Sequence, residues 1–182
     1  MHRILLLDDE QNILNALRRL FAAPLAASGE NLVVETFTSP REALKRASEG
    51  IAFDAVISDY RMAEMDGVSF LKAFREEQPH TVRLILSGYA DLDALVGAVN
   101  QAQIYRFIAK PWHDVELRAA LGQALAHHDL MLENQRLADE VRTQRGIISR
   151  QEMALRQLEA ESPGITKVNW GPNGEIIIDE DE

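Results

Sequence analysis

The sequence predicts an α/β fold, in which a doubly wound, five-stranded parallel sheet is followed by a long helix and a short β-hairpin. Five short apolar segments alternate with segments whose apolar side chains recur at helical spacing. Strands that alternate with helices in this way form parallel sheets with helices on both faces. We expect the strands at residues 3–7, 32–36, 53–58, 82–86 and 105–109.

The composition is that of an ordinary folded domain, with 46% hydrophobic and 26% charged residues in a chain of 182. The absence of cysteine excludes disulfides and thiolate zinc sites. The first apolar run is too short for a signal peptide, and no segment approaches the roughly 20 apolar residues of a membrane span, so we expect a cytoplasmic protein. The net charge of -10 disfavours non-specific binding to nucleic acid or anionic lipid.

Helices are predicted in the gaps between the strands. The first has an apolar face and bends or ends near Pro24. Ser39-Pro40-Arg41-Glu42 is typical of a capping box with proline at the first helical position, which predicts a second helix to about residue 49. A third runs from Gly67 to before Pro79, and a fourth has Asp91 as its N-cap.

A helix is also predicted from about residue 112 to 161, with a seven-residue repeat beyond residue 130. Its two seam positions hold Leu130, Leu137, Gln144, Gln151 and Leu158, and Asn134, Val141, Ile148 and Leu155. The polar seam residues and Gly146 weaken such a coiled coil, but a seam Asn favours a two-stranded state. We therefore expect a parallel homodimer, with packing inside one chain as the alternative.

Ser162-Pro163-Gly164 ends this helix, and alternating apolar residues on either side of a Gly-Pro-Asn-Gly turn predict a β-hairpin followed by an acidic tail. A lone hairpin is marginal in water, so we expect it to dock on its own coil, on its dimer mate or on another protein. The chain thus divides into an α/β domain at 1–125, a helical coiled-coil extension at 126–161 and a hairpin with acidic tail at 162–182.

Polar residues capable of phosphoryl chemistry follow four of the predicted strands: Asp8, Asp9, Asp59, Ser87 and Lys110. The carboxyl ends of adjacent parallel strands form the crevice where α/β sheets bind ligands. Three carboxylates so close together raise one another's pKa unless a cation is present, and carboxylate oxygens suit Mg²⁺. Asp59 is the best placed nucleophile for an aspartyl-phosphate. The alternative is that these residues are turn caps and surface charges.

With these motifs the chain resembles the receiver domain of two-component response regulators over about residues 1–125. The matching motifs are Asp8-Asp9, Asp59, Asp66-Gly67, Ser87-Gly88 and Lys110-Pro111. The resemblance implies a flavodoxin-like fold whose Asp59 accepts a phosphoryl group from a histidine kinase or a small phosphodonor. It implies Mg²⁺ held by Asp9, Asp59 and the main-chain carbonyl of Arg61, with Asp8 acting through water. It also implies that Ser87 bonds and Lys110 pairs with the phosphoryl group, that Phe107 is the aromatic switch, and that the Lys110-Pro111 peptide is cis.

One residue departs from the family pattern, since many relatives have proline where this chain has Ala63, so the loop after Asp59 is expected to be less rigid. About sixty residues follow the receiver region, too few for an enzyme core, and we expect a non-enzymatic switch that signals to an unidentified downstream protein. A magnesium-dependent phosphatase is an alternative, but Arg61 stands where such enzymes usually carry a second aspartate. A DNA-binding transcriptional regulator is another, disfavoured by the net acidity.

Overall fold

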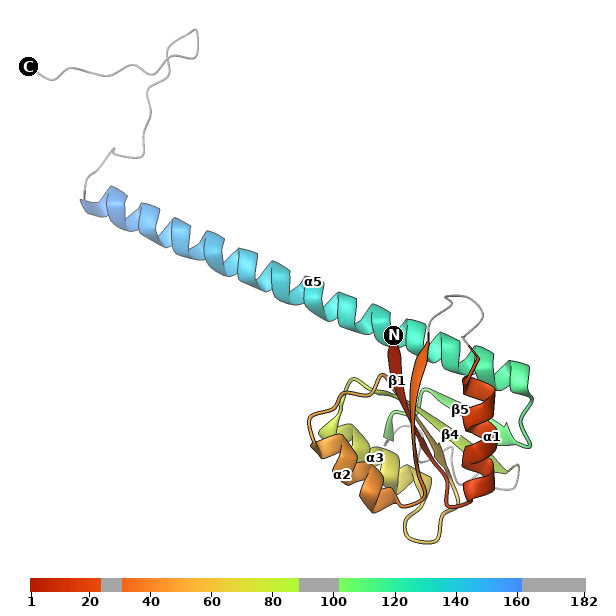
Figure 1. Ribbon diagram of the computed structural model, residues 1–182. Helices are drawn as coiled ribbons and strands as arrows, with labels where there is room; N and C mark the ends of the chain where they lie inside the picture. The colour runs from red at the N-terminus through yellow and green to blue at the C-terminus, as the bar shows by residue number, and fades with distance from the viewer. Residues whose placement is uncertain (24–30, 89–101, 162–182) are drawn as a thin grey trace, which may run out of the picture. The chain divides into compact units, whose positions relative to one another are not determined.

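The computed structural model describes residues 1–23, 31–88 and 102–161. The chain divides into two compact units, Met1–Glu133 and a second that begins at Asn134. In the first unit five strands form one parallel sheet in the order β2-β1-β3-β4-β5 (Figure 1). The strands are β1 (His2–Leu7), β2 (Leu32–Phe37), β3 (Ala55–Asp59), β4 (Val82–Gly88) and β5 (Arg106–Lys110). The predicted fold class is therefore confirmed, with small shifts in strand bounds.

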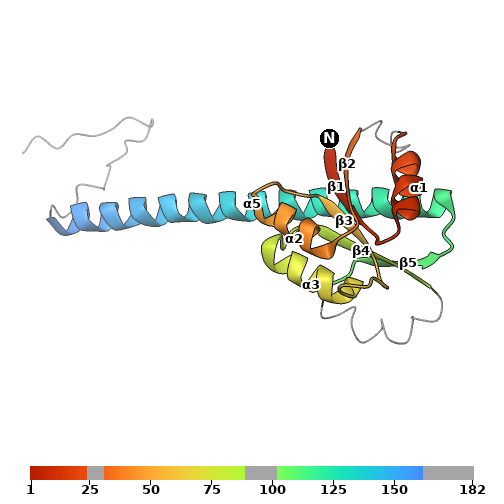
Figure 2. The ribbon, with the colours of Figure 1, turned by 60° about the horizontal axis from the view of Figure 1, so that its bottom comes forward.

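Helices cover both faces of the sheet (Figure 2). One face carries α1 (Gln11–Phe21) and the beginning of α5 (Asp114–Glu161), whose apolar side chains pack on β1, β3 and β4. The other face carries α2 (Pro40–Ser48) and α3 (Gly67–Glu77). The predicted helix at Asp91 and the predicted C-terminal hairpin lie outside the described residues.

Because both faces are covered, the central strands are apolar on both sides. Ile4 and Leu6 of β1 belong to the cluster beneath α1 and α5, whereas Leu5 and Leu7 belong to the cluster beneath α2 and α3. All four side chains are fully or almost fully buried. This alternation explains the continuous apolar runs from which the strands were predicted.

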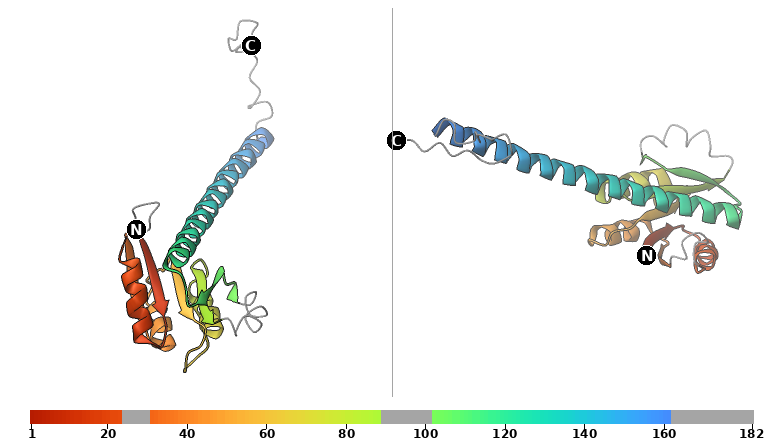
Figure 3. Two further views of the ribbon diagram at one scale, coloured as in Figure 1. Left: turned by 90° about the vertical axis from the view of Figure 1, so that its right-hand side faces the viewer. Right: turned by 90° about the horizontal axis from the view of Figure 1, so that it is seen from above.

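The predicted long helix is confirmed as α5, a single helix of 48 residues that Figure 3 shows from two further sides. At 1.5 Å per residue its length is about 72 Å. The described apolar seam residues are exposed: Leu130, Leu137, Val141, Leu155 and Leu158, by 46 to 64%. In the described part of the chain, no helix is long and apolar enough to cross a membrane.

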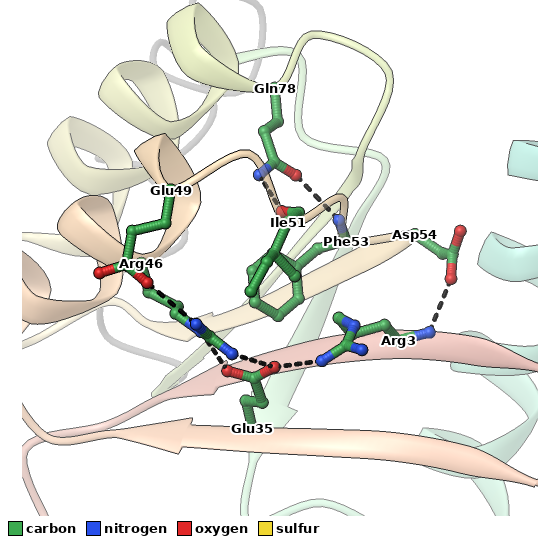
Figure 4. Close-up of polar contacts among 8 residues, drawn as sticks. All are labelled: Arg3, Glu35, Arg46, Glu49, Ile51, Phe53, Asp54 and Gln78. Carbon is green, nitrogen blue, oxygen red and sulfur yellow. Dashed lines mark hydrogen bonds and ion pairs between the residues drawn. The ribbon is translucent and has the colours of Figure 1, made fainter.

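Two polar side chains connect neighbouring segments, Glu35 within β2 and Gln78 at the end of the sheet opposite to the predicted site (Figure 4). Glu35 of β2 accepts hydrogen bonds from Arg3 and Arg46. The Gln78 amide accepts from the Phe53 N–H at 2.9 Å and donates to the Ile51 carbonyl at 2.7 Å. The Phe53 N–H thus binds a side chain and not a neighbouring strand, and the β3 ladder begins at Ala55, two residues later than predicted.

A cluster of two histidines and two aspartates lies at the same end of the sheet. The His2 imidazole is 3.5 Å from both the Asp54 and the Asp129 carboxylates, and His128 Nδ1 is 3.6 Å from the same two groups. Both histidines are buried, at 8% and 4% exposure. Since His128 and Asp129 belong to α5, the cluster connects this helix to β1 and to the residue before β3.

The capping box predicted at Ser39 is wrong in its side-chain contacts. Ser39 is the N-cap of α2 and Pro40 begins the helix, but the Ser39 side chain makes no capping hydrogen bond. Its Oγ instead donates to Glu64 Oε2 at 3.2 Å. The hydroxyl therefore connects α2 to the loop that follows β3.

Candidate functional site

The sheet brings the predicted site residues to one edge. Asp8 directly follows β1, while Asp59 and Lys110 are the last residues of β3 and β5. In the parallel ladders Asp59 pairs with Leu86, and Ser87 pairs with Ala109. All these strands run in the same direction, so their polar carboxyl-terminal residues converge.

The Lys110 ammonium group bridges two carboxylates. Its Nζ lies 2.8 Å from Asp8 Oδ2 and 2.6 Å from Asp59 Oδ1. Asp8 is 0% and Asp59 6% exposed, so both carboxylates are removed from bulk water. A buried carboxylate needs such a partner, because an unpaired charge in the interior is costly.

Burial raises the pKa of Asp59, and the hydrogen bond from Lys110 lowers it only in part, so the net shift is upward. The nearby Asp8 charge adds to the upward shift. For Lys110, burial favours the neutral amine, but its hydrogen bonds with Asp59 and Asp8 outweigh this effect and raise its pKa. Two buried carboxylates therefore share one ammonium group, so a single positive charge faces two acidic groups.

Asp9 completes a group of three carboxylates. One oxygen from each of Asp8, Asp9 and Asp59 lies within 4.8 Å of the other two. Asp9 is exposed, in contrast to the two buried aspartates. A compact set of oxygen donors with excess negative charge, open to solvent on one side, fits a hydrated Mg²⁺ ion.

A main-chain hydrogen bond joins the two ends of the loop between β3 and α3. The Gly67 N–H donates to the Tyr60 carbonyl at 2.8 Å. A Cβ at this position would lie 2.0 Å from the Asp59 carbonyl oxygen, so glycine is the residue that permits this approach. Asp66 caps α3 by accepting from the Val68 and Ser69 N–H groups. The Asp66-Gly67 motif therefore shapes the loop beside Asp59.

A second contact fixes the middle of this loop. The Ala63 N–H donates to Asp9 Oδ2 at 3.1 Å, across 54 positions in sequence. This contact was not predicted from the sequence, although Ala63 departs from the family pattern, in which many relatives have proline. The available signal was that replacing proline with alanine restores a backbone donor.

The remaining predicted residues lie where their strands place them. Ser87 is 1% exposed, next to the carboxyl end of β4. Phe107 pairs with Ile85 in the ladder and packs, partly buried, against the cluster under α2 and α3. Arg61 is exposed in the loop after Asp59. The Lys110-Pro111 peptide is cis, as the resemblance implied.

Comparisons with known proteins agree with this geometry. The model of the response regulator receiver domain family matches residues 4–122. The hydrogenase transcriptional regulatory protein HoxA of Bradyrhizobium diazoefficiens is 35% identical over 147 residues, which is 81% of this chain but 29% of that protein. The chain therefore spans less than a third of the length of that curated relative.

Solved structures give the same result. The signal receiver domain of an HD domain-containing protein from Pseudomonas fluorescens Pf-5 is 34% identical, with a TM-score of 0.62 over 70% of this chain and 97% of that one. An uncharacterized protein from Neptuniibacter caesariensis is 41% identical, with a TM-score of 0.64 over 73% and 93% of the two chains.

Proposed function

The chain belongs to the response regulator receiver domain family of two-component signalling, and on this premise we propose that Asp59 accepts a phosphoryl group from a histidine kinase or a small acyl phosphate. One observation carries the proposal: the Asp59 carboxylate ends β3 within a cluster of three carboxylates, 2.6 Å from the Lys110 ammonium group. This is an activated environment for a carboxylate nucleophile.

In the proposed transfer, a carboxylate oxygen of Asp59 forms a bond to phosphorus. The bond between phosphorus and the donor breaks, and the donor group leaves with the electron pair. The Lys110 ammonium group offsets part of the cost of burying the Asp59 carboxylate and then pairs with a phosphoryl oxygen. The Ser87 hydroxyl donates to another phosphoryl oxygen. One self-labelling event results, without turnover of an external substrate.

We propose that Asp9, Asp59 and the Arg61 carbonyl hold Mg²⁺, with Asp8 acting through water. When bound, the ion neutralises charge on the phosphoryl oxygens. The grouping of three carboxylates around one ammonium group supports this assignment.

The proposed output is a population shift between two conformations. A phosphoryl group that accepts a hydrogen bond from Ser87 favours the conformation in which that hydroxyl faces Asp59. The proposed aromatic switch is Phe107, a partly buried side chain of β5, the strand next to β4. We propose residues 1–125 as the receiver, 126–161 as a helical extension that dimerises, and 162–182 as a further docking segment. The exposed apolar seam of α5 supports the dimer, because single-chain helices rarely expose a row of such side chains.

Intact-mass analysis with acetyl phosphate and Mg²⁺ tests the phosphoacceptor. We expect one added phosphoryl group on the wild type and none on Asp59→Asn. Asp139→Asn, which changes an exposed carboxylate on α5, serves as the matched control and should be labelled like the wild type. Equal labelling of Asp59→Asn would show that the nucleophile is another residue.

Sedimentation velocity on the full chain tests the dimer. Leu155 lies in the seam and is 51% exposed, whereas Met153 is 59% exposed but lies outside the seam. We expect Leu155→Lys to shift the equilibrium toward monomer and Met153→Lys to leave it unchanged. A wild type that sediments as a monomer at all accessible concentrations contradicts the dimer.

A transcriptional role is the second candidate, and the observation that favours it is the 35% identity to HoxA, which is named as a transcriptional regulatory protein. The match covers 29% of that protein, and the net charge of -10 in this chain opposes attraction to DNA. Electrophoretic mobility shifts at low salt separate the two candidates. Sequence-specific binding by this chain would favour the transcriptional role.

A further inference from the structure

We propose that the Ala63 backbone N–H is a positioning group for the Asp9 carboxylate, and that it strengthens Mg²⁺ binding at the site. This inference rests on the proposed function, because it concerns the ion that the site is proposed to hold. The contact that carries it is the 3.1 Å hydrogen bond from Ala63 N to Asp9 Oδ2.

Asp9 needs such a partner more than the other two aspartates do. Asp8 and Asp59 are buried and fixed by Lys110, whereas Asp9 is exposed at the beginning of the loop after β1. Among residues 1–23, 31–88 and 102–161, Ala63 is the residue that hydrogen-bonds the Asp9 side chain. Without this bond the carboxylate would rotate among its staggered conformers, and a metal ion would have to order it on binding.

The donor itself is held from both sides. The loop is closed at its ends by the bond from Gly67 N to the Tyr60 carbonyl. Next to Ala63, the Glu64 carboxylate accepts from the Ser39 hydroxyl at 3.2 Å, which connects the loop to α2. The Ala63 N–H therefore has a fixed position and can orient a mobile carboxylate.

The geometry also leaves Asp9 free to bind an ion. A carboxylate has two oxygens, and the N–H engages Oδ2, so Oδ1 remains available. The same loop carries the Arg61 carbonyl, the proposed third ligand, two residues before Ala63. One hydrogen bond thus couples two segments that are proposed to contribute ligands. Receivers with proline at this position cannot form it, because proline has no N–H.

Isothermal titration of the unphosphorylated full chain with MgCl₂ tests the inference. Two changes remove the donor: Ala63→Pro, and an ester in place of the Met62–Ala63 amide, which keeps the alanine side chain. Ala63→Gln keeps the N–H and is the matched control. We expect both donor-free proteins to bind Mg²⁺ about three- to tenfold more weakly than the wild type, the loss that a hydrogen bond of ordinary strength produces. Ala63→Gln should bind like the wild type.

The ester separates loss of the donor from the effect of the proline ring on the loop. Unchanged or tighter binding by the ester overturns the inference, whatever Ala63→Pro does. If the wild type is labelled by acetyl phosphate and binds Mg²⁺, the proposed function stands even when this inference fails. If the wild type binds no Mg²⁺, the metal assignment is overturned as well. Amide exchange in the metal-free protein gives an independent readout: protection of the Ala63 N–H should fall in Asp9→Ala, and unchanged protection contradicts the hydrogen bond.

Discussion

Replacing Gly67 with alanine should disturb the phosphoacceptor loop more than any other addition of one methyl group near the site. The new Cβ would lie 2.0 Å from the Asp59 carbonyl oxygen, where ordinary van der Waals contact begins at 3.4 Å. The opposing atoms are main-chain atoms of the last β3 residue and of Tyr60, so no side chain can rotate away. Either the end of β3 or the start of α3 must move.

The cost has two parts. Overpacking against a fixed backbone costs about 1–3 kcal/mol. The displacement also breaks the hydrogen bond from Gly67 N to the Tyr60 carbonyl, worth about 1 kcal/mol. We therefore expect a loss of about 3 kcal/mol and a fall in Tm of about 10 °C for a domain of this size.

Thermal unfolding by circular dichroism measures the effect, and Gly122→Ala is the matched control. Gly122 lies inside α5, where an added Cβ would meet nothing within 4 Å, so the substitution should raise stability by up to about 1 kcal/mol through helix propensity. We also expect slower labelling of Gly67→Ala by acetyl phosphate. A Gly67→Ala protein as stable as the wild type would refute the close approach of this loop to Asp59.

Three further predictions concern the rest of the chain. The hydrogen bond from Arg46 lowers the pKa of Glu35 in spite of its burial. The ionised carboxylate therefore stabilises the fold at pH values above 4.5, the pKa in the unfolded state. This stabilisation is lost as the pH falls through the lower pKa of the folded state. In urea denaturation, Glu35→Gln should therefore lower the free energy of unfolding by about 1 kcal/mol at neutral pH, and by progressively less as the pH falls toward about 3. An equal loss at both pH values would contradict the ion pair. Gln78→Ala leaves the Phe53 N–H without this partner and should lower the free energy of unfolding by about 2–3 kcal/mol in the same assay. A negligible change would contradict the contact. Gly146→Ala, inside α5 with no atom within 4 Å of the added Cβ, should raise helix content and thermal stability, and a lower helix content would contradict a continuous helix.

The strand ends were predictable because the sheet is buried on both faces. Continuous apolar runs mark the strands, and the polar residues at the carboxyl end of each run mark the edge where Asp59 and Lys110 meet. The parallel order then brings these residues together without any knowledge of side-chain contacts. The packing of Phe107 beside β4 follows from the same ladder.

Contacts between distant segments were not predictable. The Gln78 amide binds main-chain atoms 25 and 27 positions away, and the Asp9 carboxylate binds a main-chain N–H 54 positions away. A sequence pattern reports the period of a helix or strand, but it carries no signal for a polar side chain that meets a backbone group of another loop. The capping prediction at Ser39 failed for a related reason, because the hydroxyl is oriented toward the Glu64 carboxylate of another loop and donates to it.

The closure of the β3–α3 loop bears on how this protein can vary. Surface loops usually tolerate insertions and deletions. Here the Gly67 N–H binds the Tyr60 carbonyl, the Tyr60 N–H binds the Leu86 carbonyl at 2.8 Å, and the Ala63 N–H reaches Asp9. An added or removed residue would break at least one of these bonds, whereas exposed side chains such as Arg61 can be exchanged without changing the path of the backbone. Homologues should therefore differ in the composition of this loop and conserve its length.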